Sequence, residues 1–193
     1  FYSARELFTR PGHAIRDYIE GKRVKHYKPI SMLVVLATFY GLLYYTFEID
    51  MFSGNDDGTF DYKKVNEWVG HHFPIVILLQ LPIYALGSYL VFRKQGFNYY
   101  EHIILNSFYS AQKIWFRMAV LLVLVAIGKK DDFTTVSNWM FFPELFLMFW
   151  SYGQFFKDMS KLKVLLKTFL TSLIGTFISL IVVVVFVMVF LMK

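Results

Sequence analysis

Cysteine is missing from all 193 residues of the chain. This absence excludes disulfides, zinc sites built from thiolates, and catalysis by a cysteine nucleophile. Charge is also scarce, because charged residues make up 18% of the chain while hydrophobic residues make up 56%. A soluble domain of this length rarely has such a balance, so we expect a single integral membrane domain.

Catalytic motifs are missing as well. No two histidines have the i, i+4 spacing of a two-histidine metal face, and neither a Gly-x-Ser-x-Gly motif nor a phosphate-binding glycine loop occurs. The apolar stretches contain no aspartate, which disfavours intramembrane aspartyl proteases and metal-assisted lipid transferases. We therefore expect no metal and no cofactor, and the sequence favours a protein that is not an enzyme.

Five apolar stretches are what the chain does have: residues 30–47, 73–92, 103–127, 139–156 and 164–192. Each is about long enough to cross a hydrocarbon core of roughly 30 Å as a helix. The pattern predicts an all-α bundle of five transmembrane helices over residues 30–193. The third stretch is polar in its first half, so a bundle with four crossings is the alternative.

The charges between these stretches predict an orientation. Residues 1–29 carry seven lysines and arginines, and residues 157–163 carry three, whereas residues 48–72 carry six acids against two lysines. The positive-inside rule then places the N-terminus in the cytoplasm and the C-terminus outside a plasma membrane, the inner membrane in a bacterium.

The first 29 residues form a basic, amphipathic segment that we expect to lie in the cytoplasmic interface. With a net charge of +6, the chain favours anionic lipids as partners and does not favour nucleic acid. The alternative is a solvated basic face that only sets topology. The candidate lipid contacts are Arg5, Arg10, Arg16, Lys22, Arg23, Lys25 and Lys28.

The third stretch holds the most conspicuous charges. Asn98 and Glu101 have capping-box spacing, so we expect this helix to begin near Tyr99. Lys113 and Arg117 lie four residues apart on one face, and Arg117 falls near mid-bilayer. Glu144 on the next stretch is a plausible partner. A structural ion pair or snorkelling to the headgroups is one interpretation, and a ligand or ion pathway that also includes Asn106 is the other.

Two weaker signals complete the candidates. Glu101 and His102 lie at the cytoplasmic boundary and could transfer protons. Adjacent residues of a helix point about 100° apart, so the two do not form a dyad by themselves. The alternative interpretation is that they cap the helix or are solvated. Small residues at i, i+3, i+4 and i+7 on the last stretch favour close helix packing. These are Ser172, Gly175, Thr176 and Ser179.

One segment resembles a known family. Residues 6–29, ELFTRPGHAIRDYIEGKRVKHYKP, resemble the opening signature of an uncharacterised family of bacterial multi-pass membrane proteins. The similarity continues weakly through Tyr100-Glu101-His102 and Tyr152-Gly153. Members of that family often carry a zinc ribbon before this segment, which a chain without cysteine does not contain. Because the chain begins with Phe1, we expect it to be a fragment of a longer protein.

The resemblance implies no activity, so three hypotheses stay open. The first is a non-catalytic scaffold, accessory subunit or membrane-organising protein that packs against a protein partner or forms a homo-oligomer; Yip1-like proteins offer an architectural analogy. The second is a small transporter or channel that uses the charges on the third and fourth stretches. The third is a lipid-modifying enzyme that uses Glu101 and His102.

Overall fold

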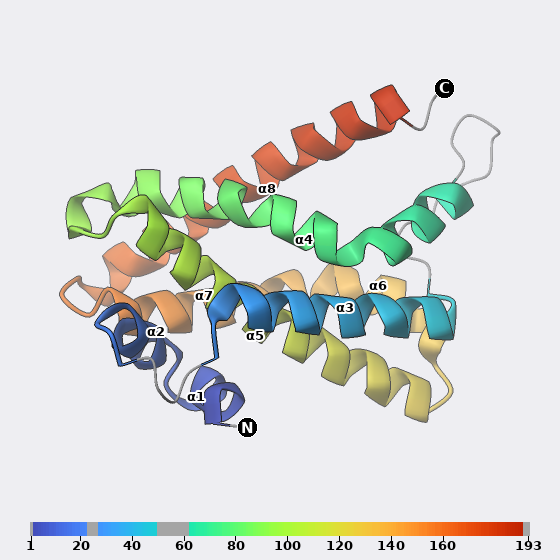
Figure 1. Ribbon diagram of the computed structural model, residues 1–193, viewed down its shortest axis with the longest axis horizontal. Helices are drawn as coiled ribbons and strands as arrows, with labels where there is room; N and C mark the ends of the chain where they lie inside the picture. Colours follow the sequence, from blue (N-terminus) through green and yellow to red (C-terminus); the bar gives the residue numbers. More distant parts are fainter. Residues whose placement is uncertain (1, 23–26, 50–61, 191–193) are drawn as a thin grey trace.

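The computed structural model describes residues 2–22, 27–49 and 62–190, and these residues form helices without any strand (Figure 1). The all-α class is therefore confirmed. The elements follow in the order α1 (Tyr2–Thr9), α2 (Pro11–Ile19), α3 (Pro29–Phe47), α4 (Tyr62–Phe92), η1 (Arg93–Gln95), α5 (Tyr99–Ala126), η2 (Lys130–Asp132), α6 (Phe133–Trp139), α7 (Phe141–Phe155) and α8 (Lys161–Phe190).

Four helices are long and apolar enough to cross a membrane: α3, α4 together with η1, α5 and α8. They are compatible with an integral, multi-pass membrane protein. Most of the fourth expected span, residues 139–156, forms α7, and a turn at Met140 separates this helix from α6, which ends at Trp139. Pro143 in the first turn of α7 supplies a reason, because its ring nitrogen cannot donate to the carbonyl of Trp139. With 15 residues, α7 is about 22 Å long, so a fifth crossing remains a prediction.

Contacts between distant segments define two ends of the bundle. At the first, which we call the α6 end, the ammonium of Lys130 donates to the carbonyl of Phe47 at 3.1 Å. The Phe133 ring lies edge-on to the ring of Tyr44 there, with centroids 5.6 Å apart. At the other, the α2 end, Phe92 stacks on Phe156 with centroids 4.1 Å apart. Figure 1 shows α3 running from the α2 end to the α6 end, and α4 returning.

The N-terminal helices α1 and α2 pack against the bundle through an apolar face. Leu7, Ala14 and Ile15 are almost completely buried. A Cβ atom added to Gly12 would lie 2.3 Å from the Cβ of Gln154, so the backbones of α2 and α7 approach as closely as glycine allows. This segment is therefore docked on α7, and its place in a membrane interface remains a prediction.

The helices α4 and α8 cross on small residues. A Cβ atom on Gly175 would lie 2.5 Å from ring carbons of Tyr84, and one on Gly87 would lie 3.5 Å from Ile174. The Thr176 hydroxyl lies 3.4 Å from the hydroxyl of Tyr84. The small-residue face that was expected to pack against another helix therefore packs against α4 of the same chain.

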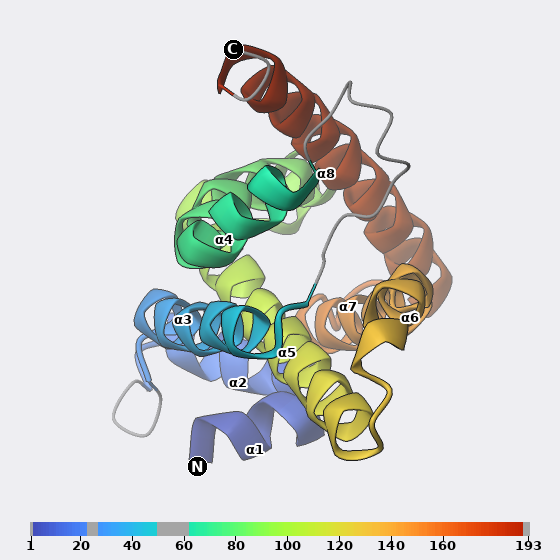
Figure 2. The ribbon, with the colours of Figure 1, turned by 90° about the vertical axis from the view of Figure 1, so that its right-hand side faces the viewer.

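Beyond this crossing, α8 leaves the other helices. Figures 1 and 2 show its C-terminal half diverging toward the end of the chain. Phe177 and Leu180 are exposed there, whereas Ser172 nearer the crossing is buried. Ser179 has a buried hydroxyl without a hydrogen-bond partner among the described residues. The outer half of α8 thus has little contact with the described bundle.

A kink in α4 meets a glycine of α3. The helix contains two prolines, Pro74 and Pro82, and its backbone angles depart from helical values at His72, two residues before Pro74. Pro74 has no N–H to donate to the carbonyl of Gly70. That carbonyl oxygen lies 3.1 Å from where a Cβ atom on Gly41 would be, so the absence of a side chain lets the two helices touch.

Candidate functional site

The central helix α5 carries a series of polar side chains into the bundle, and we call this series the α5 seam. The helix begins as expected, because the Asn98 side chain accepts from the backbone N–H of Glu101 and the Glu101 carboxylate accepts from that of Asn98. The reciprocal cap fixes where the helix starts and therefore which residues face inward. The seam residues are His102, Asn106, Tyr109, Gln112 and Arg117.

The first part of the seam is a fully buried cluster near the α2 end. The Ser88 hydroxyl of α4 lies 2.9 Å from Nδ1 of His102, and the Asn106 amide donates to the same hydroxyl oxygen at 2.8 Å. Tyr152 of α7 donates to the side-chain oxygen of Asn106 at 2.9 Å. All four side chains are buried, so this network joins α4, α5 and α7 inside the apolar core.

The protonation of this cluster follows from a count of its hydrogens. Ser88 has one hydroxyl hydrogen, and the carbonyl of Ala85 lies 3.0 Å from that hydroxyl. If Ser88 donates to this carbonyl, Nδ1 of His102 must carry a hydrogen and donate to Ser88. In the neutral imidazole Nε2 of His102 is then the acceptor, and it has no hydrogen-bond partner among the described residues.

The middle of the seam ties α1 to the bundle. The Gln112 amide donates to the backbone carbonyl of Leu7 at 2.9 Å, and the Ser151 hydroxyl donates to the Gln112 side-chain oxygen at 2.9 Å. One buried side chain, Gln112, therefore joins α1, α5 and α7. It also supplies a hydrogen-bond donor to a carbonyl in the last turn of α1, where carbonyls have no partner within the helix.

The far part of the seam is an ion pair between α5 and α7. Nε of Arg117 donates to a carboxylate oxygen of Glu144, and these side chains are 27% and 11% exposed. The Tyr109 hydroxyl donates to the backbone carbonyl of Glu144 at 3.2 Å. The hydroxyls of Tyr40 and Tyr44 of α3 lie 3.2 Å apart. Both tyrosines are close enough to the ion pair to interact with its charges. The charges singled out in the sequence are thus paired with each other.

The four intramembrane candidates do not meet at one place. Lys113 lies over the ring of Tyr84, at 5.7 Å from its centroid, whereas the ion pair joins Arg117 to Glu144. Asn106 belongs to the buried cluster, eleven residues or about 16 Å along α5 from Arg117. The candidates therefore divide into a buried cluster, an ion pair and a cation–π contact.

Glu101 and His102 also belong to different environments. The Glu101 carboxylate caps its own helix at 2.7 Å from the Asn98 nitrogen, and the His102 ring is buried against Tyr89 and Phe156. Groups of three or more His, Cys, Asp or Glu side chains that could hold a metal are not found in the described part of the chain. Glu101 and His102 thus make different contacts, one at the helix start and one in the core.

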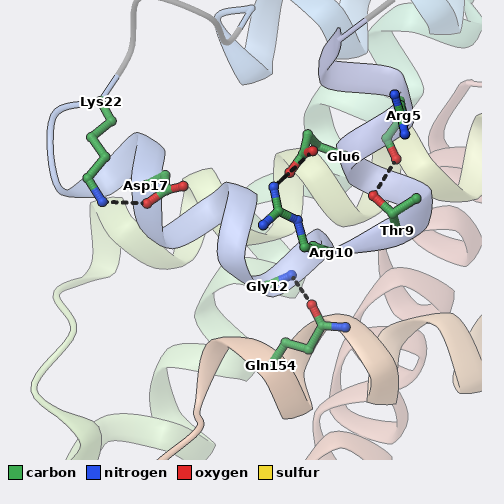
Figure 3. A network of polar contacts seen from close by, with 8 residues as sticks. All are labelled: Arg5, Glu6, Thr9, Arg10, Gly12, Asp17, Lys22 and Gln154. Carbon is green, nitrogen blue, oxygen red and sulfur yellow. Dashed lines mark hydrogen bonds and ion pairs between the residues drawn. The ribbon is translucent and has the colours of Figure 1, made fainter.

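Several of the basic residues expected to contact lipid are paired within the chain. Arg10 contacts Glu6 at 2.9 Å, and Lys22 contacts Asp17 at 2.7 Å, which raises the pKa of the Lys22 ammonium (Figure 3). Arg16 donates to the carbonyl of Phe155 at 2.6 Å, at the C-terminal end of α7 where a cation is favourable.

The remaining members of that set are placed differently. Arg16 also contacts Asp158 at 3.5 Å and lies over the rings of Phe97 and Phe155. Arg5 and Lys28 are exposed. Arg23 and Lys25 lie outside the described residues. Arg16 therefore acts first as a clamp between α2 and α7.

Sequence reasoning missed the partners that complete the seam. Ser88 and Ser151 are single hydroxyls in apolar helices, and nothing in their spacing marks them as special. A signal does exist on α5, because His102, Asn106 and Tyr109 follow at i, i+4 and i+7 and so share one face. A polar face on an apolar helix indicates polar partners on whichever helices cover it.

Comparison with known proteins places the N-terminal part of the chain. A family model described as "Protein of unknown function (DUF3667)" matches residues 1–41. The matched part covers α1, α2 and the first two thirds of α3, and it contains Gly12 and Arg16, which contact α7. No curated protein and no solved structure matches the chain. The match is consistent with the uncharacterised family to which the sequence pointed.

Proposed function

We propose that this chain is a non-catalytic integral membrane protein, a scaffold or accessory subunit whose intramembrane polar residues hold its own helices together. The observation that carries the proposal is the α5 seam, in which Gln112 and Arg117 each contact groups of other helices. A ligand site instead needs polar groups that converge on a substrate and are left unpaired for it.

The two other functions receive less support from the same contacts. A transporter built on Lys113, Arg117, Glu144 and Asn106 needs these residues around one pathway, yet they occupy separate environments. A lipid-modifying enzyme needs Glu101 and His102 in one pocket, yet the first caps a helix and the second is buried.

The proposal includes five crossings of a bacterial inner membrane, with the α2 end in the cytoplasm and the C-terminus outside. The basic loops favour this orientation because positive residues are retained on the cytoplasmic side. The fifth crossing is α7, which leads from α6 to the α2 end and precedes α8. Its helix is short for a bilayer core of roughly 30 Å, so α6 and Met140 would complete the path.

The absence of cysteine makes the orientation easy to test. Asn138 of α6 and Lys157 after α7 are both exposed, so each can be replaced by cysteine in a chain that has no other. We expect a membrane-impermeant maleimide to label Asn138→Cys in intact cells, and to label Lys157→Cys only after permeabilisation. Labelling of both positions in intact cells would contradict a crossing by α7.

Native mass spectrometry of the protein, gently extracted from its own membrane, tests the function. A stoichiometric protein partner or a defined homo-oligomer is the expected result. A monomer that carries a small molecule, and loses it in the Arg117→Met variant, would overturn the proposal. The comparison with a Lys22→Gln variant controls for the loss of a positive charge, because Lys22 is 67% exposed and lies outside the seam.

A further inference from the structure

Four cations gather where α4 ends and α8 begins, and we call this group the α4–α8 edge. Its members are Arg93, Lys94, Lys161 and Lys163, all exposed. None of the four has an acidic partner within ion-pair distance among the described residues. Asp158, the acid that precedes α8, contacts Arg16 instead. The edge therefore carries positive charge that no acidic side chain of the described residues neutralises through an ion pair.

A contact between the two helices sets the register of this edge. The Lys167 ammonium donates to the carbonyl of Val91 at 2.6 Å and lies over the Phe92 ring. Since α4 and α8 run in opposite directions, the turn of α8 before Lys167 lies beside the turn that follows Val91 (Figure 1). Lys163 and Lys94 belong to those two turns, so cations from both helices reach one edge.

The start of α8 adds positive potential to the same place. The first turn of a helix presents unpaired N–H groups and the positive end of the helix dipole, and acidic residues are favoured there. The first turn of α8 contains Lys161 and Lys163 and no acid. Cations at this position repel the dipole as well as one another, and a bound anion would relieve that repulsion.

Apolar side chains border the edge on both helices. Leu162 and Leu166 of α8 are 66% and 61% exposed, and Leu90 of α4 is 52% exposed. A soluble anion would gain nothing from these leucines. A phospholipid would place its phosphate on the cations and its acyl chains along the leucines, so the edge fits both halves of a lipid.

We propose that the α4–α8 edge binds the headgroup of an anionic phospholipid, and that the N-terminal basic segment is not the main lipid site. Arg10, Arg16 and Lys22 of that segment already contact carboxylates of the chain. The inference rests on the membrane location in the proposed function, but not on the scaffold role.

The test compares two variants that each lose three positive charges. One is Arg93→Gln with Lys94→Gln and Lys163→Gln, at the edge. Its matched control is Arg5→Gln with Lys22→Gln and Lys28→Gln, in the N-terminal segment. Each purified protein is titrated in detergent with phosphatidylglycerol, and with phosphatidylcholine of the same acyl chains, and bound lipid is counted by native mass spectrometry. Melting temperatures in phosphatidylcholine verify that the variants fold.

We expect wild-type protein and the N-terminal variant to prefer phosphatidylglycerol, and the edge variant to lose at least about tenfold of that preference. A cation near an anionic surface contributes about fivefold in affinity, so three set an upper limit of about a hundredfold. If the edge triple variant does not fold, the single variants Lys94→Gln and Lys163→Gln should each lose about fivefold.

Three results would overturn the inference. The N-terminal variant could lose the preference while the edge variant keeps it, or both could lose it equally, which indicates a general effect of net charge. Displacement of phosphatidylglycerol by excess inorganic phosphate would show that a free anion, not a lipid, occupies the edge. Because the assay counts lipids bound to the purified chain, failure to find a protein partner for the scaffold would leave its outcome unchanged.

Discussion

Removing one member of the Arg117–Glu144 pair should cost more stability than removing both. Glu144→Gln leaves the Arg117 guanidinium without a counter-charge, in a site where the two side chains are 27% and 11% exposed. Breaking a buried ion pair costs about 3–5 kcal/mol, and the partial exposure of Arg117 lowers this to about 2–4 kcal/mol. Arg117→Met combined with Glu144→Met removes both charges, so its unfolding free energy should lie within about 1 kcal/mol of the wild-type value.

The assay is a double-mutant cycle on the free energy of unfolding in detergent micelles, with Glu144→Met, Arg117→Met and the double variant that combines them, and Glu144→Gln is measured beside the cycle. Glu101→Gln is the control for the loss of a carboxylate. Since glutamine also fits the third position of a capping box, Glu101→Gln should cost less than about 1 kcal/mol. The coupling between Arg117 and Glu144 should then be about 2–4 kcal/mol.

A double variant as unstable as Glu144→Gln would refute the reasoning, because the loss would then come from packing and not from an uncompensated charge. Unchanged stability in all the variants would refute it as well. If unchanged stability came with the loss of a bound small molecule, the pair would belong to a ligand site, and the transporter hypothesis would replace the scaffold.

Two further predictions use the same unfolding measurement. Gly12→Ala places a Cβ atom 2.3 Å from that of Gln154, so it should lower the unfolding free energy by about 1–3 kcal/mol. The control is Gly153→Ala, whose Cβ atom meets nothing within 4 Å and which should be neutral or stabilising. Equal effects of the two substitutions would contradict the docking of α2 on α7. Asn106→Leu leaves the hydroxyls of Ser88 and Tyr152 without their amide partner, so it should lower the unfolding free energy by about 1–3 kcal/mol. An unchanged unfolding free energy would show that the cluster contributes nothing to stability.

Local signals in the sequence predicted the helical class and part of the site. The capping box of Asn98 and Glu101 locates the start of α5, because its two hydrogen bonds join side chains and backbone groups only three residues apart in the sequence. The pairing of Arg117 with Glu144 was anticipated because an intramembrane cation needs a counter-charge and the neighbouring stretch offers one.

Other features depend on contacts that the sequence does not encode locally. An apolar run such as residues 139–156 has the composition of one span, and only Pro143 signals that its helix begins again at Phe141. The pairing of Lys22 with Asp17 could have been anticipated from their closeness in the sequence. The role of Arg16 could not, because its partners on α7 lie more than a hundred residues away.

That separation bears on how the protein is assembled. Arg16 and its acceptor at Phe155 are 139 positions apart, and ribosomes add about 5–20 residues per second, so about 7–28 s pass between the synthesis of the two residues. During this interval Leu7 and Ile15 have been made, but α7 has not. The side of α2 that α7 covers therefore waits on the nascent chain without its partner and is open to chaperones or insertion factors. Its docking is a late step, and protection of this segment from protease during synthesis would report that α7 has arrived.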